Sequence, residues 1–435
     1  MKNSLIDLPK PKLTLLQMLG PSIVFVALSL NGGEILIWPD LVGRFGFQIL
    51  WPIPLVLLLQ YMVNLEIERY TIATGKNTVT GLLSLSRWLA PLFLIAIFIS
   101  LVWPAWASIA GNMIAHLLGL DYKVYGAFCS TFLLFGLLFI WFSPGVYQFL
   151  EKLTRFGLLV ILAIASVVII NLFNFQAISN SIQPVWFPTT PSDKITFLSG
   201  LAYGGVAGVL NLVQSDWVAK KKYAVASLQE NKEINWNSET TRLNWKRWWS
   251  LIKKEHFTMF YVGNFVGILL IALVSLSTLT NQGLKGFSLL IYQVNLLNER
   301  FTILGTFWGI AIVVLFVMAQ ITILDAAGRL IKHSIGEKKM IKNISSERIS
   351  QAFGLIGVVI LSVAIFKPGF NQPSGLLEIS ASLSAFVMCL YPPILLRLNS
   401  KLPKVVRPGI VNTLFLWFTT LFYAGMVVWG VWGQF

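Results

Sequence analysis

An apolar stretch near the beginning of the chain, residues 18–39, is long enough to cross a membrane but is interrupted in its middle. A bilayer core of about 30 Å needs ~20 apolar residues in a helix. The interruption is Asn31-Gly32-Gly33-Glu34, where two glycines weaken the helix and a carboxylate enters the hydrocarbon. Unwound backbone persists at that depth only where protein buries it or where it lines an aqueous cavity. We interpret residues 31–34 as the break of a discontinuous helix rather than a plain helix end, because residues 35–38 continue the apolar run.

Similar apolar stretches recur along the whole chain. Hydrophobic residues make up 56% of the 435 residues and charged residues only 12%, which is typical of a protein with many membrane spans. The two cysteines and three histidines are scattered, so a Cys/His metal site is excluded. The eleven predicted spans are 18–39, 46–65, 89–117, 125–142, 154–173, 196–217, 257–280, 301–328, 349–366, 375–396 and 409–432.

The distribution of basic residues predicts the orientation of these spans. The net charge is +15, which could suggest a nucleic-acid partner. If the N-terminus is cytoplasmic, however, 27 of the 33 Lys and Arg residues lie in inner segments, as the positive-inside rule requires. We therefore expect an integral protein of a prokaryotic cell (inner) membrane with its C-terminus outside. The bilayer is the expected partner and nucleic acid is not; the sequence carries no signal for an oligomeric state.

The sixth span, residues 196–217, is the most glycine-rich of the chain and includes Gly204, Gly205 and Gly208. Gly204 and Gly208 could form a close-packing face, since they stand in GxxxG spacing. Spans one and six, however, begin two halves of five spans each, and an odd offset inverts one half relative to the other. Glycine-interrupted helices at corresponding places in two halves point to a transporter binding site near the bilayer midplane. We therefore predict a second broken helix here.

Several polar residues near the inner ends of spans have simple structural interpretations. Arg69 is expected to pair with a nearby glutamate, and Asp325 with Arg329 one turn later. Gln320 lies deeper and is a candidate to face a cavity. In the insertion after span six, Trp245 and Trp248 share one face of an amphipathic helix, which we expect to lie on the membrane surface.

These patterns divide the chain into a lead, two halves and an additional helix. The predicted parts are a cytoplasmic lead (1–17), a first five-helix repeat (18–173), an outer loop (174–195), a second five-helix repeat (196–396) with a cytoplasmic insertion (219–256), and the eleventh helix (397–435).

Motifs around the first span and in later spans resemble a known family. The relevant residues are Gly20-Pro21 followed after a gap by Asn31-Gly32-Gly33-Glu34, then Gly46, Leu50-Trp51, Gln60, Glu68 to Gly75, Gly204 to Leu212, Gln320, Tyr391-Pro392-Pro393 and Arg397. In this pattern the chain resembles the NRAMP (natural resistance-associated macrophage protein) family of divalent metal transporters. The similarity covers all eleven spans in order, but the family's DPGN and MPHN motifs are altered.

The resemblance implies an all-α LeuT-type fold, with a 5+5 inverted repeat, broken helices 1 and 6 and an eleventh helix, that works by alternating access. Carried over by position, the metal ligands become Asn31, Glu34 and Asn211, with Gly208 where the family has methionine. The thioether that favours softer ions is therefore lost, and one carboxylate and two amides remain. Such an oxygen set suits Mg²⁺, Ca²⁺ or Mn²⁺. The family's proton-linked histidine is Leu210 here, which leaves Glu34 as the candidate proton carrier.

Three functional hypotheses follow. The first is a secondary transporter of a divalent cation, with the proton as the candidate coupling ion. The residues expected to bind the substrate are Asn31, Gly32, Gly33, Glu34, Gly205, Gly208, Asn211 and Gln320. The second is a LeuT-type transporter of a small organic solute such as an amino acid or amine, because a fold does not fix a function. The third is a non-transporting receptor or scaffold. We predict no cofactor and no enzymatic activity, since no nucleophile–base pair or phosphate loop appears.

Overall fold

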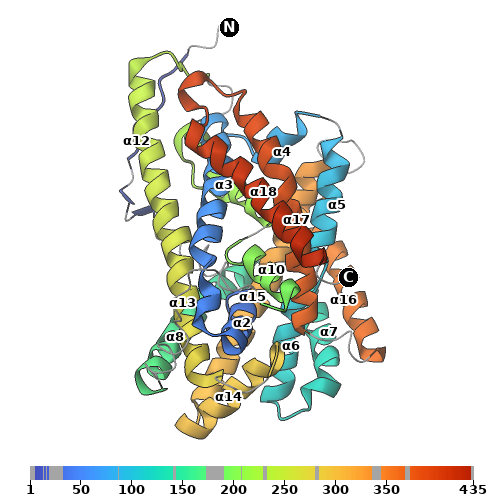
Figure 1. Ribbon diagram of the computed structural model, residues 1–435. Coiled ribbons are helices and arrows are strands. Elements are labelled where there is room, and N and C mark those ends of the chain that lie inside the picture. The colour runs from blue at the N-terminus through green and yellow to red at the C-terminus, as the bar shows by residue number, and fades with distance from the viewer. Residues whose placement is uncertain are drawn as a thin grey trace.

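The computed structural model is a helical bundle in which the regular elements of the described residues are all helices (Figure 1). Ile6 and Ile234 form an isolated bridge between two extended segments. The structure describes residues 5–12, 14–15, 17–18, 33–86, 88–140, 144–172, 191–206, 208–228, 233–279, 284–335, 344–367 and 373–432.

The helices follow the order of the predicted spans. They are α2 (Ile37–Phe45), η1 (Phe47–Leu50), α3 (Ile53–Thr74), α4 (Thr78–Leu83), α5 (Leu89–Leu101), α6 (Ala105–Leu117), α7 (Tyr122–Ile140), α8 (Pro144–Leu172), α10 (Lys194–Ala202), α11 (Leu210–Lys220), η2 (Ala224–Ser227), α12 (Glu239–His256), η3 (Phe257–Val262), α13 (Gly263–Leu279), α14 (Phe287–Phe301), α15 (Leu304–Ile335), α16 (Ser346–Phe366), α17 (Pro373–Asn399), η4 (Lys404–Val406) and α18 (Ile410–Trp432).

Within the described residues, eight helical segments are long and apolar enough to cross a membrane. The predicted sixth span is not among them, because it consists of two short helices, α10 and α11. The prediction of a broken sixth helix is therefore confirmed. The first span lies partly outside the described residues, which begin again at Gly33, so the count of eleven spans and the inverted repeat stay predictions.

The third span is also interrupted, which the sequence analysis did not predict. Val102 ends α5, Pro104 precedes α6, and both helices lie within one apolar segment. Gln320 of α15 accepts a hydrogen bond from the backbone N–H of Ala107 at 3.0 Å. Because the first turn of a helix has unsatisfied N–H groups, this buried side chain stabilises the start of α6.

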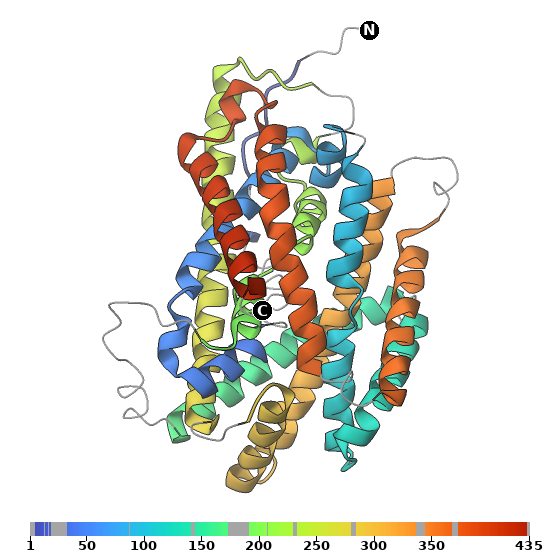
Figure 2. The ribbon, with the colours of Figure 1, turned by 45° about the vertical axis from the view of Figure 1, so that its right-hand side comes forward.

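The amphipathic helix of the insertion does not lie flat, and the prediction of a membrane-surface helix is wrong. It is α12, which runs along the length of the bundle and continues through a π-helical turn, η3, into α13 (Figures 1 and 2). Its tryptophan face is covered by protein: Trp248 is buried and donates from Nε1 to the carbonyl of Pro9, and Asn244 donates to that of Leu8. The apolar face that the sequence shows is therefore used to hold the N-terminal lead.

A buried charge network joins the C-terminal ends of α3 and α17 to the start of α18. Arg69 donates from Nε to Glu66 Oε2 at 2.9 Å, as predicted, and Glu66 also accepts hydrogen bonds from Asn399 and Asn412. The glutamate side chain is fully buried. Removing the partner of a buried charge typically costs about 3–5 kcal/mol, because the remaining charge is uncompensated.

We therefore expect Arg69→Ala to lower the midpoint of thermal unfolding in detergent markedly, as followed by tryptophan fluorescence. Arg329→Ala is the matched control, since the Arg329–Asp325 pair has a similar separation of 2.8 Å but is partly exposed. Exposed pairs contribute only about 0–1 kcal/mol. An equal loss of stability in both variants would contradict the assigned importance of the Glu66 network.

Candidate functional site

The turns that precede α2 meet the break of the sixth helix. Residues 33–36 form the turns that precede α2, and Gly33 packs directly on Tyr203 at the end of α10. A Cβ atom at Gly33 would lie 2.9 Å from the carbonyl oxygen of Tyr203, so only glycine allows this approach. The backbone of the first helix, N-terminal to α2, is thus placed against the backbone of the sixth.

Glycines also fix the path of the chain through the break of the sixth helix. Gly208 has φ of +69°, the left-handed region that side chains other than glycine rarely adopt. A Cβ there would lie 2.9 Å from that of Ser384 on α17, and one at Gly205 would lie 2.7 Å from Gln60 Oε1 on α3. The predicted site residues Gly205 and Gly208 therefore act through backbone shape, which brings the start of α11 close to α17.

The C-terminal end of α10 faces this break with its carbonyl groups. Tyr423 donates to the carbonyl of Leu201, and Gln60 donates to that of Ala202, each at 3.2 Å. The next carbonyl, of Tyr203, is the one that lies against Gly33. The C-terminal end of a helix carries partial negative charge, and Glu34, fully buried, follows Gly33 directly. Both features favour a cation at the breaks.

Asn211, in the first turn of α11, lies among side chains of α17. Its Nδ2 donates to Tyr391 Oη at 3.2 Å and lies 3.7 Å from the sulfur of Met388. Asn211 Oδ1 has no hydrogen-bond partner among the described residues. The sequence predicts an oxygen-only site because Gly208 stands where the family has methionine, but Met388 brings a thioether beside Asn211 from another helix.

The remaining predicted site residues are Asn31, Gly32, Gly33, Glu34 and Gln320, and the structure describes only the last three. Asn31 and Gly32 lie outside the described residues. Gly33 and Glu34 lie in the turns before α2, where the backbone N–H of Trp38 donates to the Gly33 carbonyl at 2.8 Å. Gln320 is bonded to the start of α6, as described above, and its role in binding stays a prediction.

Ion pairs close the end of the site that we expect to be outside. Arg44 of α2 pairs with Asp40 at 2.6 Å and with Asp193, at the start of α10, at 2.8 Å. Burial alone would raise the pKa of Asp193, but hydrogen bonds from Arg44 and Thr196 outweigh it and hold that pKa below its usual range. Thr196 also donates to Glu378 of α17 at 2.8 Å. These contacts link both broken helices to each other and to α17.

A second buried polar cluster, which sequence reasoning did not find, lies toward the opposite end. Gln214 of α11 donates to Glu68 of α3, and the same nitrogen lies 3.2 Å from Nδ1 of His256. His256 and Glu68 are 3.6 Å apart. The three residues are far apart in the sequence. The available signal was the spacing of Gln60, Asn64 and Glu68, which repeats every helical turn on one face of α3.

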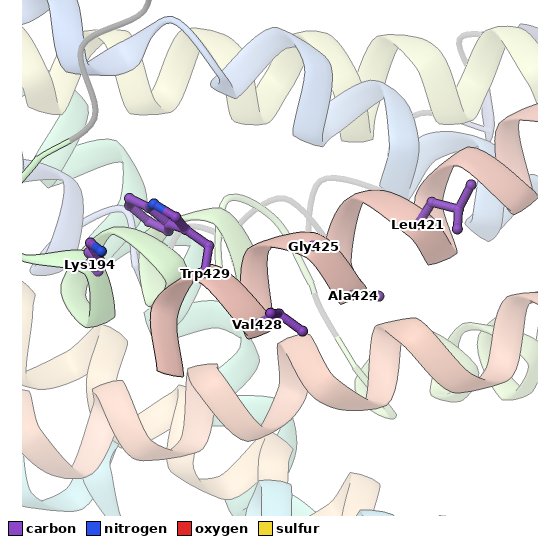
Figure 3. Close-up of a pocket in the computed structure, with 6 residues that line it drawn as sticks. All are labelled: Lys194, Leu421, Ala424, Gly425, Val428 and Trp429. Carbon is purple, nitrogen blue, oxygen red and sulfur yellow. The ribbon is translucent and has the colours of Figure 1, made fainter. Parts of the chain in front are cut away.

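A surface groove is distinct from this interior site. It has a volume of about 490 Å³ and lies along α18 beside the start of α10 (Figure 3). Leu421, Ala424, Gly425, Val428 and Trp429 form its apolar wall. Lys194 lies over the Trp429 ring at 5.2 Å. Such an apolar surface on the outer helix of a membrane bundle is accounted for by contact with lipid.

Comparisons with known proteins identify the fold. No protein-family model matches the sequence, and no curated protein is similar to it at a significant level. Among solved structures, a mutant of the Eremococcus coleocola manganese transporter is similar with a TM-score of 0.71 and 14% identity, over 98% of this chain and 89% of that one.

Two structures with organic compounds bound are also similar. A nucleobase-cation-symport-1 family transporter with bromovinylhydantoin bound has a TM-score of 0.56 and 10% identity, over 95% of this chain and 92% of that one. MhsT in complex with L-phenylalanine has a TM-score of 0.54 and 12% identity, over 96% and 98%. The chain therefore has the LeuT-type fold, as predicted, and these likenesses extend to the fold alone.

Proposed function

We propose that this protein is a secondary transporter that moves a divalent cation across the membrane by alternating access. The substrate site is the meeting point of the two helix breaks. Glu34 supplies the charge, and Asn31 and Asn211 supply amide oxygens, as in the resemblance to NRAMP proteins. Glu34 is also the candidate proton carrier at this site.

The observation that carries the proposal is the electrostatic character of the breaks. Glu34 is fully buried, and the carbonyl end of α10 lies against the neighbouring Gly33. Burying a carboxylate in a membrane protein is costly, and such residues usually mark the path of an ion or substrate. A divalent cation would offset both the carboxylate and the helix-end dipole.

The kind of cation follows from the available donors. Glu34, Asn211 and backbone carbonyls offer oxygen, which suits Mg²⁺, Ca²⁺ and Mn²⁺. Met388 adds one thioether near Asn211, and of these three ions Mn²⁺ gains most from a softer donor. We therefore expect Mn²⁺ to be accepted together with Mg²⁺, rather than excluded.

A small organic solute, such as an amino acid or amine, is the alternative. The observation in its favour is the glycine content of the breaks, since Gly205 and Gly208 leave backbone without side chains around the site. The N-terminal ends of α2 and α11 could bind a carboxylate, and Glu34 could pair with an amine.

Uptake by purified protein in proteoliposomes separates the two proposals. A metal-sensitive dye is enclosed in the vesicles, and Mn²⁺, Mg²⁺ or Ca²⁺ is added outside, with and without a pH gradient. Saturable entry that protein-free vesicles lack would support a cation transporter, and the order of rates would test the donor argument. If folded protein admits none of the three ions, the cation proposal is wrong, and binding of amino acids and amines is measured next.

A further inference from the structure

We propose that Glu68, Gln214 and His256 form a second, proton-binding site at the inner end of the broken sixth helix. This inference deepens the proposed function, since it assigns the proton as the coupling ion and gives it a site apart from Glu34. The experiments below are chosen so that the proton site can be tested even if the substrate is not a cation.

The cluster joins three elements that meet in the interior. Glu68 belongs to α3 and Gln214 to α11, and His256 is the last residue of α12. Each of the three residues is at most 6% exposed. The imidazole is held between two rings: Tyr61 is stacked at 5.6 Å and Phe260 at 5.0 Å between ring centroids. Its orientation is therefore fixed, with Nδ1 toward Gln214 and Glu68.

The geometry allows two proton states with different contacts. In the observed arrangement the amide nitrogen of Gln214 faces both Glu68 Oε1 and His256 Nδ1, so Nδ1 is a hydrogen-bond acceptor and carries no proton. A proton bound at Nδ1 makes it a donor, which cannot pair with the amide N–H but can form an ion pair with Glu68, 3.6 Å away.

Protonation therefore changes how α11 is attached. In the unprotonated state Gln214 of α11 forms hydrogen bonds with both Glu68 of α3 and His256 of α12. In the protonated state the hydrogen bond between Gln214 and His256 is lost, and His256 forms an ion pair with Glu68 instead. Because α11 is the inner half of a broken helix, it is the kind of element whose movement opens a site of this fold. Proton binding at His256 thus favours release of α11.

Neighbouring titratable groups act on this cluster. Glu255, next to His256, pairs at 2.7 Å with Lys221, which directly follows α11, and Lys221 also lies 5.5 Å from the centre of the Tyr223 ring. Tyr61 donates its hydroxyl to the carbonyl of Lys253. The titratable groups that face Glu68 or His256 are Glu255 of α12, Lys221 after α11, Tyr61 of α3 and Tyr223 before η2.

A line of polar side chains connects this cluster to the helix breaks. Gln60, Asn64 and Glu68 lie on one face of α3 at intervals of one turn, about 6 Å apart along the axis. Gln60 bonds to the carbonyl of Ala202 at the break. Asn64 is fully buried, and its amide has no hydrogen-bond partner among the described residues. Polar side chains buried within membrane proteins usually mark ion or substrate pathways, and Glu68 is the titratable member of this line.

Histidine NMR tests the site without any transport. The chain has three histidines, so ¹³C-labelled imidazole signals of the protein in nanodiscs can be assigned with His116→Gln and His333→Gln. We expect the His256 signal to titrate, and we follow it over the whole pH range in which the protein stays folded. Its midpoint should move by about one pH unit or more in Glu68→Gln, because a charge in contact with it is removed. Asp325→Asn, which removes a carboxylate outside the cluster, should leave it unchanged.

Uptake measurements test whether this proton is coupled to transport. Glu68→Gln and His256→Gln should each retain uptake of Mn²⁺ but lose most of its stimulation by a pH gradient, while Asp325→Asn keeps that stimulation. An unchanged His256 titration in Glu68→Gln would overturn the proton site, and full stimulation in both variants would overturn its coupling. If no cation is transported at all, the NMR result still decides whether the site binds a proton.

Discussion

Glu34→Gln is expected to abolish cation uptake, with a loss of about 100-fold or more. The substitution keeps the size of the side chain but removes the charge of a fully buried carboxylate at the break of the first helix. Contacts to a charged group contribute about 1.5–3 kcal/mol, and 1.4 kcal/mol corresponds to tenfold in affinity. The carbonyl end of α10 would remain, but a partial dipole cannot replace a full charge beside a divalent ion.

The measurement is initial uptake of Mn²⁺ and Mg²⁺ into proteoliposomes at saturating and low concentrations. Glu378→Gln is a control, because Glu378 of α17 is a partly buried carboxylate that accepts a hydrogen bond from Thr196 rather than lying at the breaks. We expect the control to retain uptake within a few fold. Uptake by Glu34→Gln at the wild-type rate would exclude Glu34 as the ligand and would place the cation site elsewhere in the protein.

The sequence predicted those features that depend on local composition. The interruption at residues 31–34 and the glycines of the sixth span are departures from an apolar helix, so each could be recognised without knowing the neighbours. The pairing of Arg69 with Glu66 and of Arg329 with Asp325 follows from helical spacing alone, and the structure confirms both.

The features that were missed depend on which helices become neighbours. The tryptophans of α12 form an apolar face, but the sequence cannot say whether lipid or protein covers it, and Leu8 and Pro9 do so from the far end of the chain. Likewise, no local pattern connects Glu68 with His256. The interruption at Pro104 was hidden because Trp103 and its neighbours keep the segment apolar.

The backbone conformation at Gly208 predicts that a side chain at this position strongly reduces uptake. The resemblance to NRAMP proteins places a methionine here, so Gly208→Met would seem to restore a metal ligand. The structure predicts the opposite, because Gly208 has φ of +69° and a Cβ atom would lie 2.9 Å from Ser384 Cβ and 3.1 Å from its Cα. The left-handed conformation costs a side chain about 1–2 kcal/mol, and overpacking a filled interior costs about 1–3 kcal/mol more.

We therefore expect Gly208→Met to reduce uptake by about tenfold or more and to lower the thermal midpoint, with no gain in preference for Mn²⁺ over Mg²⁺. Gly136→Met is the matched control, since a Cβ at Gly136 of α7 meets no atom within 4 Å. Gly208→Met combined with Ser384→Gly should recover part of the uptake, because the second change removes the closest contact, with Ser384 Cβ, but neither the contact with its Cα nor the backbone strain. Retained uptake with a raised Mn²⁺ preference in the single variant would mean that position 208 points its side chain into the ion site, as the resemblance implies, and that the left-handed turn is not required for transport.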